Sequence, residues 1–495
     1  MATDHERDMR IVIIGGGISG LSSAFYLRRM AAERGIPLQV MMIEKSDRLG
    51  GKIETLRTDG FVIEKGPDSF LTRKQAIIDL ADDLGIAGEL TKINPSGKRA
   101  YIVHRNKLYP MPQGLVLGVP TEVMPFATTG LLSPMAKLRA ALDFVLPARK
   151  GTQDESVGSF LERRMGSEVV ERVAEPLLAG IYAGELNKLS LRATFPQFRE
   201  SERKYGSLIR GMRMSVKKGA AGGGTPVDPR FRGAPFLTFR RGLSTMVEAL
   251  DAALAGCERR MGRSAVAVRK TDAGAILNGR RYAVELDNGE TLAADAVIVS
   301  TPAFAASPLL DSHVDVSALR NIDYVSVANV VLAFDKAAFG LDFAGSGFLV
   351  PRTEGRHITA CTWTSSKWLH TSPQDKVLLR CYVGRANDEA SVELPDDQLT
   401  AAVLQDIRDI LGIRADVKPL FTEITRLRHS MPQYPVGHVE AIQGLQEELA
   451  EQLPGVYVIG NAIDGIGLPD CIRQGKATAR QALGELAGTA VADAN

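Results

Sequence analysis

The sequence of 495 residues contains few of the features that mark disulfide scaffolds or metal sites. Its four cysteines (Cys257, Cys361, Cys381, Cys471) lie far apart and form no C-x-x-C pair. This argues against a disulfide framework, a zinc site and a redox dithiol, and favours a reducing compartment. The seven histidines show no spacing typical of metal ligands. We therefore expect no metal.

The sequence also lacks a charge excess of one sign and a long apolar run. Lys and Arg number 60 against 58 Asp and Glu, so the formal net charge of +2 gives no electrostatic reason to expect nucleic acid as a partner. No run of about 18 apolar residues predicts a membrane span. Residues 1–9 are charged and have no apolar signal core. We expect a cytoplasmic protein with at most peripheral membrane contact.

A glycine-rich stretch near the N-terminus organises the rest of the chain. Residues 11–14 are an unbroken β-branched run, which is typical of a buried parallel strand. Gly15, Gly17 and Gly20 follow with G-x-G-x-x-G spacing, and residues 21–30 have a helical pattern. Such glycines allow a tight turn and a close approach to a pyrophosphate, which the N-terminus of the helix favours.

A second apolar segment, residues 38–43, ends in Glu44. This is the spacing at which a carboxylate accepts a hydrogen bond from a ribose hydroxyl. Strand, glycines, helix, strand and acid together predict a dinucleotide-binding unit of the Rossmann type. We find no second G-x-G-x-x-G after a strand, so a separate nicotinamide domain is not expected.

The segments that follow resemble the flavin-binding start of the amine oxidase and protoporphyrinogen oxidase superfamily. They are Arg48-Leu49-Gly50-Gly51-Lys52 and the tight turn at Gly66-Pro67-Asp68-Ser69. Residues 455–467 add a strand and a glycine turn near the C-terminus, followed by a helix from about Asp470. Two ends of a chain that close on one extended cofactor suit FAD better than NAD.

Further motifs resemble the porphyrinogen oxidases of the Gram-positive type. They are residues 66–70 (GPDSF), 175–184 (EPLLAGIYAG), 194–198 (TFPQF), 430–434 (SMPQY), 436–438 (VGH) and 465–472 (GIGLPDCI). The resemblance runs nearly end to end. It implies FAD-dependent oxidation of coproporphyrinogen III, and also of protoporphyrinogen IX, with O₂ as acceptor and H₂O₂ as product, in haem biosynthesis. It also implies possible protein partners from the haem pathway.

The resemblance implies a set of FAD contacts along the chain. Ile466 to Leu468 would place backbone N–H groups near the flavin pyrimidine, and Val266 would contact the adenine through its backbone. The full set is Gly15, Gly17, Ser19, Gly20, Glu44, Lys45, Lys52, Gly66, Pro67, Asp68, Ser69, Val266, Asn461, Ile466, Gly467 and Leu468. Hydride transfer to flavin N5 needs no nucleophile, so we assign no catalytic residue.

Fewer residues are expected to bind the substrate. Asp68 stands where the mitochondrial relatives have an arginine that faces a substrate propionate, and a carboxylate cannot make that pair. We therefore expect Lys74, or else Arg73, to hold a propionate. By the resemblance, Ile181 and Tyr382 would line the cavity. An aromatic ring stacked on a pyrrole ring would supply apolar contact area and orient the substrate without adding charge.

The length predicts two or three domains in an α/β fold: a Rossmann-type FAD-binding domain, a β-sheet substrate domain and a mainly helical insertion. Helices are expected at residues 74–84, 133–146, 157–164, 167–178 and 197–214. The expected parts are 1–85, 236–302 and 439–495 for FAD binding, 86–215 for the helical insertion with part of the substrate domain, 216–235 for a mobile loop, and 303–438 for substrate binding.

Residues 111–135 are rich in Met, Leu, Phe, Pro and Gly and poor in charge. They could form an irregular loop packed on the core, or an apolar collar around a substrate entrance or a membrane contact. Three other functions also stay open. A flavin amine oxidase shares the frame, although Asn461 and Ala462 stand where an aromatic pair would be expected. A binding protein without flavin, like the GDP-dissociation inhibitors, is of another class, and a phytoene-desaturase-like enzyme is the third.

Overall fold

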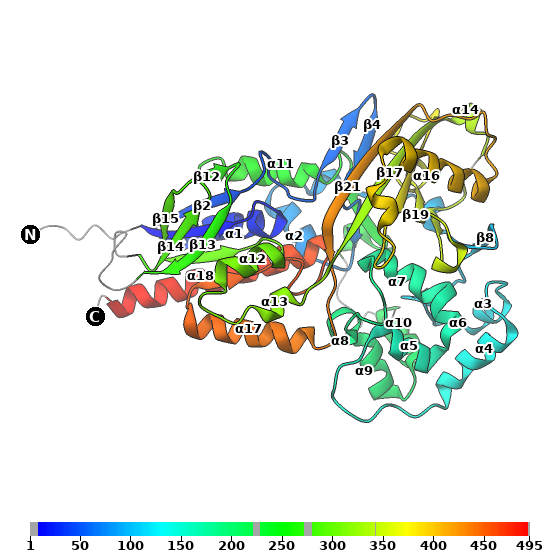
Figure 1. The fold of residues 1–495 in the computed structure, drawn as a ribbon, viewed down its shortest axis with the longest axis horizontal. Coiled ribbons are helices and arrows are strands. Elements are labelled where there is room, and N and C mark those ends of the chain that lie inside the picture. Colours follow the sequence, from blue (N-terminus) through cyan, green and yellow to red (C-terminus); the bar gives the residue numbers. More distant parts are fainter. Residues whose placement is uncertain (1–7, 221–227, 272–279, 342, 494–495) are drawn as a thin grey trace, which may run out of the picture.

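The computed structural model describes residues 8–220, 228–271, 280–341 and 343–493. Three regions are visible in Figure 1. One end of the elongated molecule holds a parallel sheet with both chain ends beside it, and the other end holds a larger sheet above a group of helices. This confirms the α/β fold with a β-sheet region and a helical region. The predicted mobile loop 216–235 lies partly outside the described residues, at 221–227.

The first region is built on a five-stranded sheet in the order β12-β2-β1-β16-β22. All neighbouring strands pair in parallel, as expected for a Rossmann unit. Residues 11–13 have no exposed surface, which explains the unbroken β-branched run. The strands are β1 (Met9–Ile14), β2 (Leu38–Glu44), β12 (Glu258–Met261), β16 (Ala296–Val299) and β22 (Val456–Val458).

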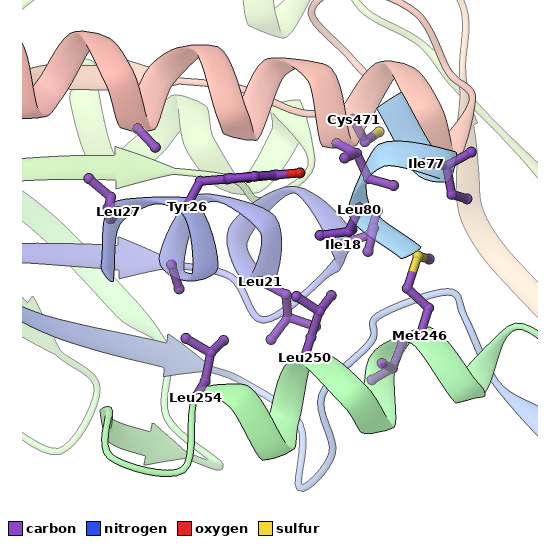
Figure 2. Packing of buried hydrophobic residues seen from close by; sticks show 14 of the residues in the cluster. Ile18, Leu21, Tyr26, Leu27, Ile77, Leu80, Met246, Leu250, Leu254 and Cys471 are labelled. Atoms are coloured by element: carbon purple, nitrogen blue, oxygen red, sulfur yellow. The ribbon is translucent and has the colours of Figure 1, made fainter. Parts of the chain in front are cut away.

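Helices cover one face of this sheet. Figure 2 shows Ile18, Leu21 and Leu27 of α1 packed between the C-terminal helix α18 and helix α11. The two ends of the chain are therefore in direct contact through α1 and α18, as the sequence predicts. The helices are α1 (Ile18–Arg34), α2 (Ala76–Asp83), α11 (Ser244–Ala253) and α18 (Leu468–Asp493).

A separate apolar cluster covers the other face of the sheet. It joins a three-stranded antiparallel sheet to three helices. These elements are β13 (Ala265–Lys270), β14 (Tyr282–Leu286), β15 (Thr291–Ala294), α12 (Ala303–Leu310), α13 (Ser317–Arg320) and α17 (His438–Gln452). β14 and β15 pair as a hairpin around Asp287-Asn288-Gly289.

The second region is a seven-stranded sheet in the order β21-β17-β20-β19-β18-β7-β8. Its two long strands, β17 and β21, run from the larger lobe toward the first region (Figure 1). The strands are β7 (Ala100–His104), β8 (Lys107–Pro110), β17 (Tyr324–Asp335), β18 (Gly347–Leu349), β19 (Ile358–Trp363), β20 (Lys376–Val383) and β21 (Phe421–Pro432), with helices α14 (Lys336–Phe339), α15 (Thr364–Lys367) and α16 (Asp396–Leu411).

Short strands connect these regions. β3 (Thr55–Thr58) and β4 (Phe61–Glu64) form a hairpin around Asp59-Gly60, which packs on the large sheet through Phe61 and Ile63. The other short strands are β5 (Phe70–Leu71), β6 (Leu90–Lys92), β9 (Leu115–Val116), β10 (Val119–Pro120) and β11 (Phe236–Phe239).

The third region is helical. Its helices are α3 (Val123–Thr128), α4 (Pro134–Ala141), α5 (Val157–Met165), α6 (Ser167–Val169), α7 (Glu175–Tyr182), α8 (Leu191–Thr194), α9 (Pro196–Tyr205) and α10 (Leu208–Ala220). Ser133 caps α4: its hydroxyl accepts a hydrogen bond from the N–H of Ala136.

Several predicted helix boundaries are wrong. The helix expected at 197–214 is two helices, because Gly206 has a left-handed conformation that ends α9. The helix expected at 167–178 contains a π-helical turn and continues to Tyr182. The helix expected at 133–146 ends at Ala141 and is followed by a 3₁₀ turn. Residues 216–220, expected in a loop, belong to α10.

Candidate active site

The glycine turn between β1 and α1 shows which glycines the fold itself requires. A Cβ on Gly20 would lie 2.0 Å from the carbonyl oxygen of Gly15, and a Cβ on Gly15 would lie 2.8 Å from Ser300 Oγ. A Cβ on Gly17 would meet no described atom within 4 Å. Gly15 and Gly20 are therefore needed for packing, whereas Gly17 faces open space. This is the position at which a bound phosphate would approach the backbone.

The start of α1 fits an anion for a second reason. No described side chain caps its N-terminus, where Gly17 is the N-cap residue. Ser19 is buried in the first turn. Helix N-termini carry partial positive charge, so an uncapped end beside open space suits a pyrophosphate.

Glu44 lies at the carboxyl end of β2, beside this turn. Its Oε2 accepts a hydrogen bond from the N–H of Gly16 at 2.7 Å, and its Oε1 accepts one from the N–H of Ser46 at 2.8 Å. These bonds hold the carboxylate next to the glycine turn, as the ribose-binding prediction requires. Lys45 follows on the exposed surface.

The segment from Arg48 to Lys52 is fastened to the glycine turn. The N–H of Gly50 donates to the carbonyl of Gly16 at 2.8 Å. Arg48 donates to the carbonyl of Gly51 at 2.6 Å and pairs with Glu54. These two contacts hold the turn at residues 48–52 in shape. Lys52 donates its ammonium to the carbonyl of Ser430 in β21, and burial lowers the pKa of Lys52 to about 8.

The turn at residues 66–69 lies against the same segment. A Cβ on Gly66 would lie 1.8 Å from the carbonyl oxygen of Lys52, so only glycine fits there. Pro67 and Ser69 are partly buried, and the Ser69 hydroxyl donates to Asp68 at 2.6 Å. The three glycine segments of the sequence therefore meet in one place.

Asp68 is held by two cations. Its Oδ2 lies 3.3 Å from Lys367 Nζ and 3.9 Å from Arg380 Nη1. Burial by itself would raise the pKa of Asp68, but Lys367 and Arg380 outweigh it and hold that pKa at about 2. Arg380 also donates to the carbonyl of Gly66. Asp68 thus organises the turn and is not available as a free carboxylate.

The C-terminal segment completes the site. The side chain of Gln474 in α18 hydrogen-bonds to both the N–H and the carbonyl of Gly460. The hydroxyl of Tyr434 donates to the carbonyl of Asn461 at 2.5 Å, and Ile466 packs against the helical region's core. Gly467 and Leu468 lie at the start of α18.

Val266, expected to contact adenine through its backbone, lies at an irregularity in β13. The register shifts between Ala265 and Ala267, so Val266 is left out of the pairing with β14. Its side chain is 49% exposed. An exposed residue outside the ladder can offer its backbone to a ligand, whereas a buried valine could not.

The predicted substrate residues lie on β20, on α7 and in the loop before α2. Tyr382 is in β20, and the Arg380 guanidinium lies over its ring at 5.0 Å from the centroid. Ile181 is partly exposed in α7, a helix that lies against β18 and β19. Lys74 pairs with Asp470, the third residue of α18, at 2.6 Å, and Arg73 is exposed. Lys74 is therefore not a free cation, which the sequence reading did not foresee.

The sequence reading also missed Arg380, Lys367 and Ser300. Ser300 lies under the glycine turn, where its hydroxyl lies 3.0 Å from the carbonyl oxygens of Ile14 and Gly15. One signal could have found Arg380. It is an arginine inside an otherwise apolar strand, and a fully buried arginine is rare unless it is paired.

The described part of the chain holds no group of three or more His, Cys, Asp or Glu residues placed to bind a metal ion. Likewise, none of its described helices is long and apolar enough to cross a membrane.

The chain is similar to known proteins over most of its length. Residues 18–483 match the family model described as flavin containing amine oxidoreductase. The chain is 44% identical over 473 residues to coproporphyrinogen III oxidase of Bacillus subtilis (strain 168), covering 96% of this chain and 97% of that protein. It is 38% identical over 488 residues to coproporphyrinogen III oxidase of Staphylococcus aureus, covering 96% of this chain and 99% of that one.

Solved structures give the same result for the fold. The putative protoporphyrinogen oxidase from Exiguobacterium sp. 255-15 superposes with a TM-score of 0.83 at 36% identity, covering 96% of this chain and 98% of that one. A putrescine oxidase variant superposes with a TM-score of 0.68 at 15% identity, covering 97% of this chain and 100% of that one, and so shares the fold.

Proposed function

Because this chain belongs to the flavin-containing amine oxidoreductase family, we propose that it is an FAD- and oxygen-dependent porphyrinogen oxidase of haem biosynthesis. Its substrate is coproporphyrinogen III, which it oxidises to coproporphyrin III, and it also accepts protoporphyrinogen IX. One observation carries this proposal: identity of 44%, over nearly the whole of both chains, to a protein named coproporphyrinogen III oxidase.

The residues present fit FAD. Open space at Gly17 and the uncapped start of α1 support a pyrophosphate there, and the register shift at Val266 supports a backbone contact to adenine. Bound FAD would supply a hydride acceptor for the six-electron oxidation of the porphyrinogen, with O₂ as final acceptor and H₂O₂ as product. The residues that we propose to hold it are Gly15, Gly17, Ser19, Gly20, Glu44, Lys45, Lys52, Gly66, Pro67, Asp68, Ser69, Val266, Asn461, Ile466, Gly467 and Leu468.

The chain's own contribution to the reaction is positioning. Tyr382 and Ile181 are proposed to line the substrate cavity, and the ring of Tyr382 is oriented by Arg380. Lys74 keeps 43% of its side chain exposed, so its ammonium can serve a propionate while it remains bound to Asp470. No general base is required if the macrocycle is held close to the acceptor, because proximity supplies a large part of the rate.

The surroundings of the site also belong to the proposal. Val123 and Met124 of α3 and Met135 and Leu138 of α4 are exposed apolar side chains at one end of the helical region (Figure 1). Much of residues 111–135 is nevertheless packed on the core. We propose that the exposed part serves substrate entry, contacts a membrane surface or binds a haem-pathway protein.

All four cysteines are free thiols. This supports a location in the reducing cytoplasm.

The test is anaerobic mixing of the purified, FAD-loaded protein with coproporphyrinogen III. Flavin absorbance should bleach, and admission of O₂ should restore it with release of H₂O₂ and appearance of porphyrin fluorescence. Putrescine and other amines are the matched comparison, and they should leave the absorbance unchanged. A protein that binds no flavin, or one that is bleached by amines and not by the porphyrinogen, would refute the proposal.

A further inference from the structure

A short segment between β21 and α17 connects the helical region to the C-terminal part of the candidate site. Two sequence motifs, residues 430–434 and 436–438, lie here, and none of their residues is among the proposed cofactor contacts. The segment passes close to α8 (Figure 1), where the N–H of Ser190 donates to the carbonyl of Tyr434 at 2.8 Å. The N–H of Gly437 donates to Asp154 at 3.0 Å. The backbone of this segment is therefore fixed to the helical region.

Two buried side chains of the same segment hold the loop at residues 460–465. The hydroxyl of Tyr434 donates to the carbonyl of Asn461 at 2.5 Å, and Nε2 of His438 lies 3.1 Å from the carbonyl oxygen of Ile463. A carbonyl oxygen can only accept a hydrogen bond, so Nε2 of His438 must carry a proton. Tyr434 is 1% exposed and His438 is 3% exposed. Each side chain therefore acts on the loop as a buried hydrogen-bond donor.

The rings of Tyr434 and His438 also support each other. They stack with their centroids 4.2 Å apart and their planes 10° apart. The Tyr434 ring packs edge-on against Tyr182 at the end of α7, with 6.0 Å between centroids, and Gln433 Nε2 donates to the carbonyl of Tyr182 at 2.8 Å. Tyr182 follows Ile181, which is proposed to line the substrate cavity. One segment thus contacts α7 on the proposed substrate side and the loop on the proposed cofactor side.

Side chains set the conformation of this loop, because residues 460–465, all of them described, form neither a helix nor a strand. Gln474 of α18 is a third buried donor, and it bonds to the carbonyls of Gly460 and Asp464 at 3.2 and 2.9 Å. Directly after the loop, the N–H groups of Ile466 and Gly467 have no acceptor among the described residues. These two donors remain available to a ligand, at the place proposed for the flavin pyrimidine.

We propose that Tyr434 and His438 are positioning residues, which hold the loop so that the N–H groups of Ile466 and Gly467 meet the flavin at a fixed distance from α7. They act through the loop and are not catalytic residues. The inference rests on the proposed function, because it assigns the two side chains to the same site. Loss of either hydrogen bond loosens the loop, which weakens FAD binding and slows transfer from the substrate.

The first test follows the loop itself and needs no activity. Hydrogen–deuterium exchange of the full-length protein, with FAD and after its removal, is measured by mass spectrometry on peptides that cover residues 460–468. Tyr434→Phe removes one hydroxyl and keeps both ring contacts, so exchange in these peptides should become about tenfold faster. Exchange equal to that of the wild type in both forms would overturn the inference.

Tyr282→Phe is the matched control for that variant. Tyr282 is also 1% exposed, and its hydroxyl donates to the carbonyl of Pro454 at 2.7 Å, which lies before β22 and outside the loop. Tyr282→Phe should lose a similar amount of thermal stability and keep wild-type exchange at residues 460–468. If the two variants had the same effect on the loop, Tyr434 would have a general structural role only, and the inference would be wrong.

The second test measures the cofactor. In Tyr434→Phe the dissociation constant of FAD should rise about tenfold, because one hydrogen bond that holds the loop is lost. The midpoint potential of the bound flavin should also fall, because hydrogen-bond donors beside the ring favour its reduced form. Tyr282→Phe should change neither quantity. A wild-type dissociation constant and potential in Tyr434→Phe would contradict the positioning role.

Variants of His438 give the same readouts if Tyr434→Phe does not fold. His438→Gln keeps a donor that can reach the carbonyl of Ile463, whereas His438→Leu has none. The glutamine variant should therefore retain most of the FAD affinity that the leucine variant loses. Equal losses in the two variants would show that the hydrogen bond of His438 does not position the loop.

These measurements separate the inference from the proposed function. If Tyr434→Phe matched the wild type in loop exchange, FAD affinity and oxidation of coproporphyrinogen III, the inference alone would be wrong. If the wild type did not oxidise the porphyrinogen but the variants changed the loop and FAD affinity as expected, the proposed function alone would be wrong. A wild-type protein that binds no FAD would overturn both.

Discussion

Lys74 and Asp470 stand 396 residues apart in the sequence, yet Lys74 Nζ lies 2.6 Å from Asp470 Oδ1. Lys74 precedes α2, and Asp470 lies in the first turn of α18, whose N-terminal end is proposed to contact the flavin. The pair therefore ties the N-terminal and C-terminal parts of the candidate site together. It also fixes the ammonium group that we propose to serve a propionate.

Replacement of Lys74 tests that role. Lys74→Met should raise KM for coproporphyrinogen III about fivefold with little change in kcat, because a partly exposed charge pair contributes about 1 kcal/mol. Steady-state porphyrin fluorescence measures both constants. Arg73→Met is the matched control and should behave as wild type. If Arg73→Met raises KM and Lys74→Met does not, the propionate is held by the other cation.

Substitutions at Gly17 and Gly20 should distinguish an effect on cofactor binding from an effect on folding. Gly17→Ala should change the free energy of unfolding of the flavin-free protein by no more than about 0.5 kcal/mol, because the new methyl meets no described atom. It should weaken FAD binding about tenfold or more, because the methyl occupies the space where the pyrophosphate approaches.

Gly20→Ala is the comparison for that variant. Its Cβ would lie 2.0 Å from the carbonyl of Gly15, so the flavin-free protein should itself lose about 1–3 kcal/mol. Urea unfolding and FAD titration by fluorescence quenching measure the two quantities. If FAD affinity were unchanged in Gly17→Ala, the proposal that the pyrophosphate binds at this turn would be wrong.

Glu64 should make stability depend on pH. Its folded-state pKa of about 7 lies above the ordinary value of 4.5, so its contribution is fully present below about pH 4.5 and is lost as pH rises through about 7. The difference in unfolding free energy between wild type and Glu64→Gln should therefore change by about 1–3 kcal/mol between pH 5 and pH 8, with wild type relatively weaker at pH 8. Urea unfolding across this range measures it, and a constant difference would show that Glu64 ionises normally.

A buried ion pair anchors the helical region. Arg164 and Asp143 have no exposed surface, and Arg164 Nε lies 2.5 Å from Asp143 Oδ1. Arg164→Met would leave Asp143 buried without its cation and should cost about 3–5 kcal/mol. Arg414→Met, which breaks the exposed pair with Asp416, should leave the free energy of unfolding nearly unchanged. Chemical denaturation compares the two; similar costs would mean that Asp143 is reached by water.

The fold was predictable wherever the pattern is local. The run at residues 11–14 predicts β1 because a strand buried on both faces needs apolar residues at every position. The spacing of Gly15, Gly17 and Gly20 predicts the turn into α1 for reasons of backbone geometry. Helix boundaries were less predictable: Gly206 divides the helix expected at 197–214, and the helix expected at 167–178 continues to Tyr182.

The sequence by itself determined the Rossmann unit, the family resemblance and the glycine-rich segments that meet at the candidate site, because glycine turns and strand patterns depend on neighbouring residues. Only the tertiary structure decided which charges face one another. Asp68 is paired with Lys367 and Arg380, and Lys74 with Asp470, across hundreds of residues. A side chain's partners and its access to water follow from how distant segments pack, and no local spacing in the sequence records that.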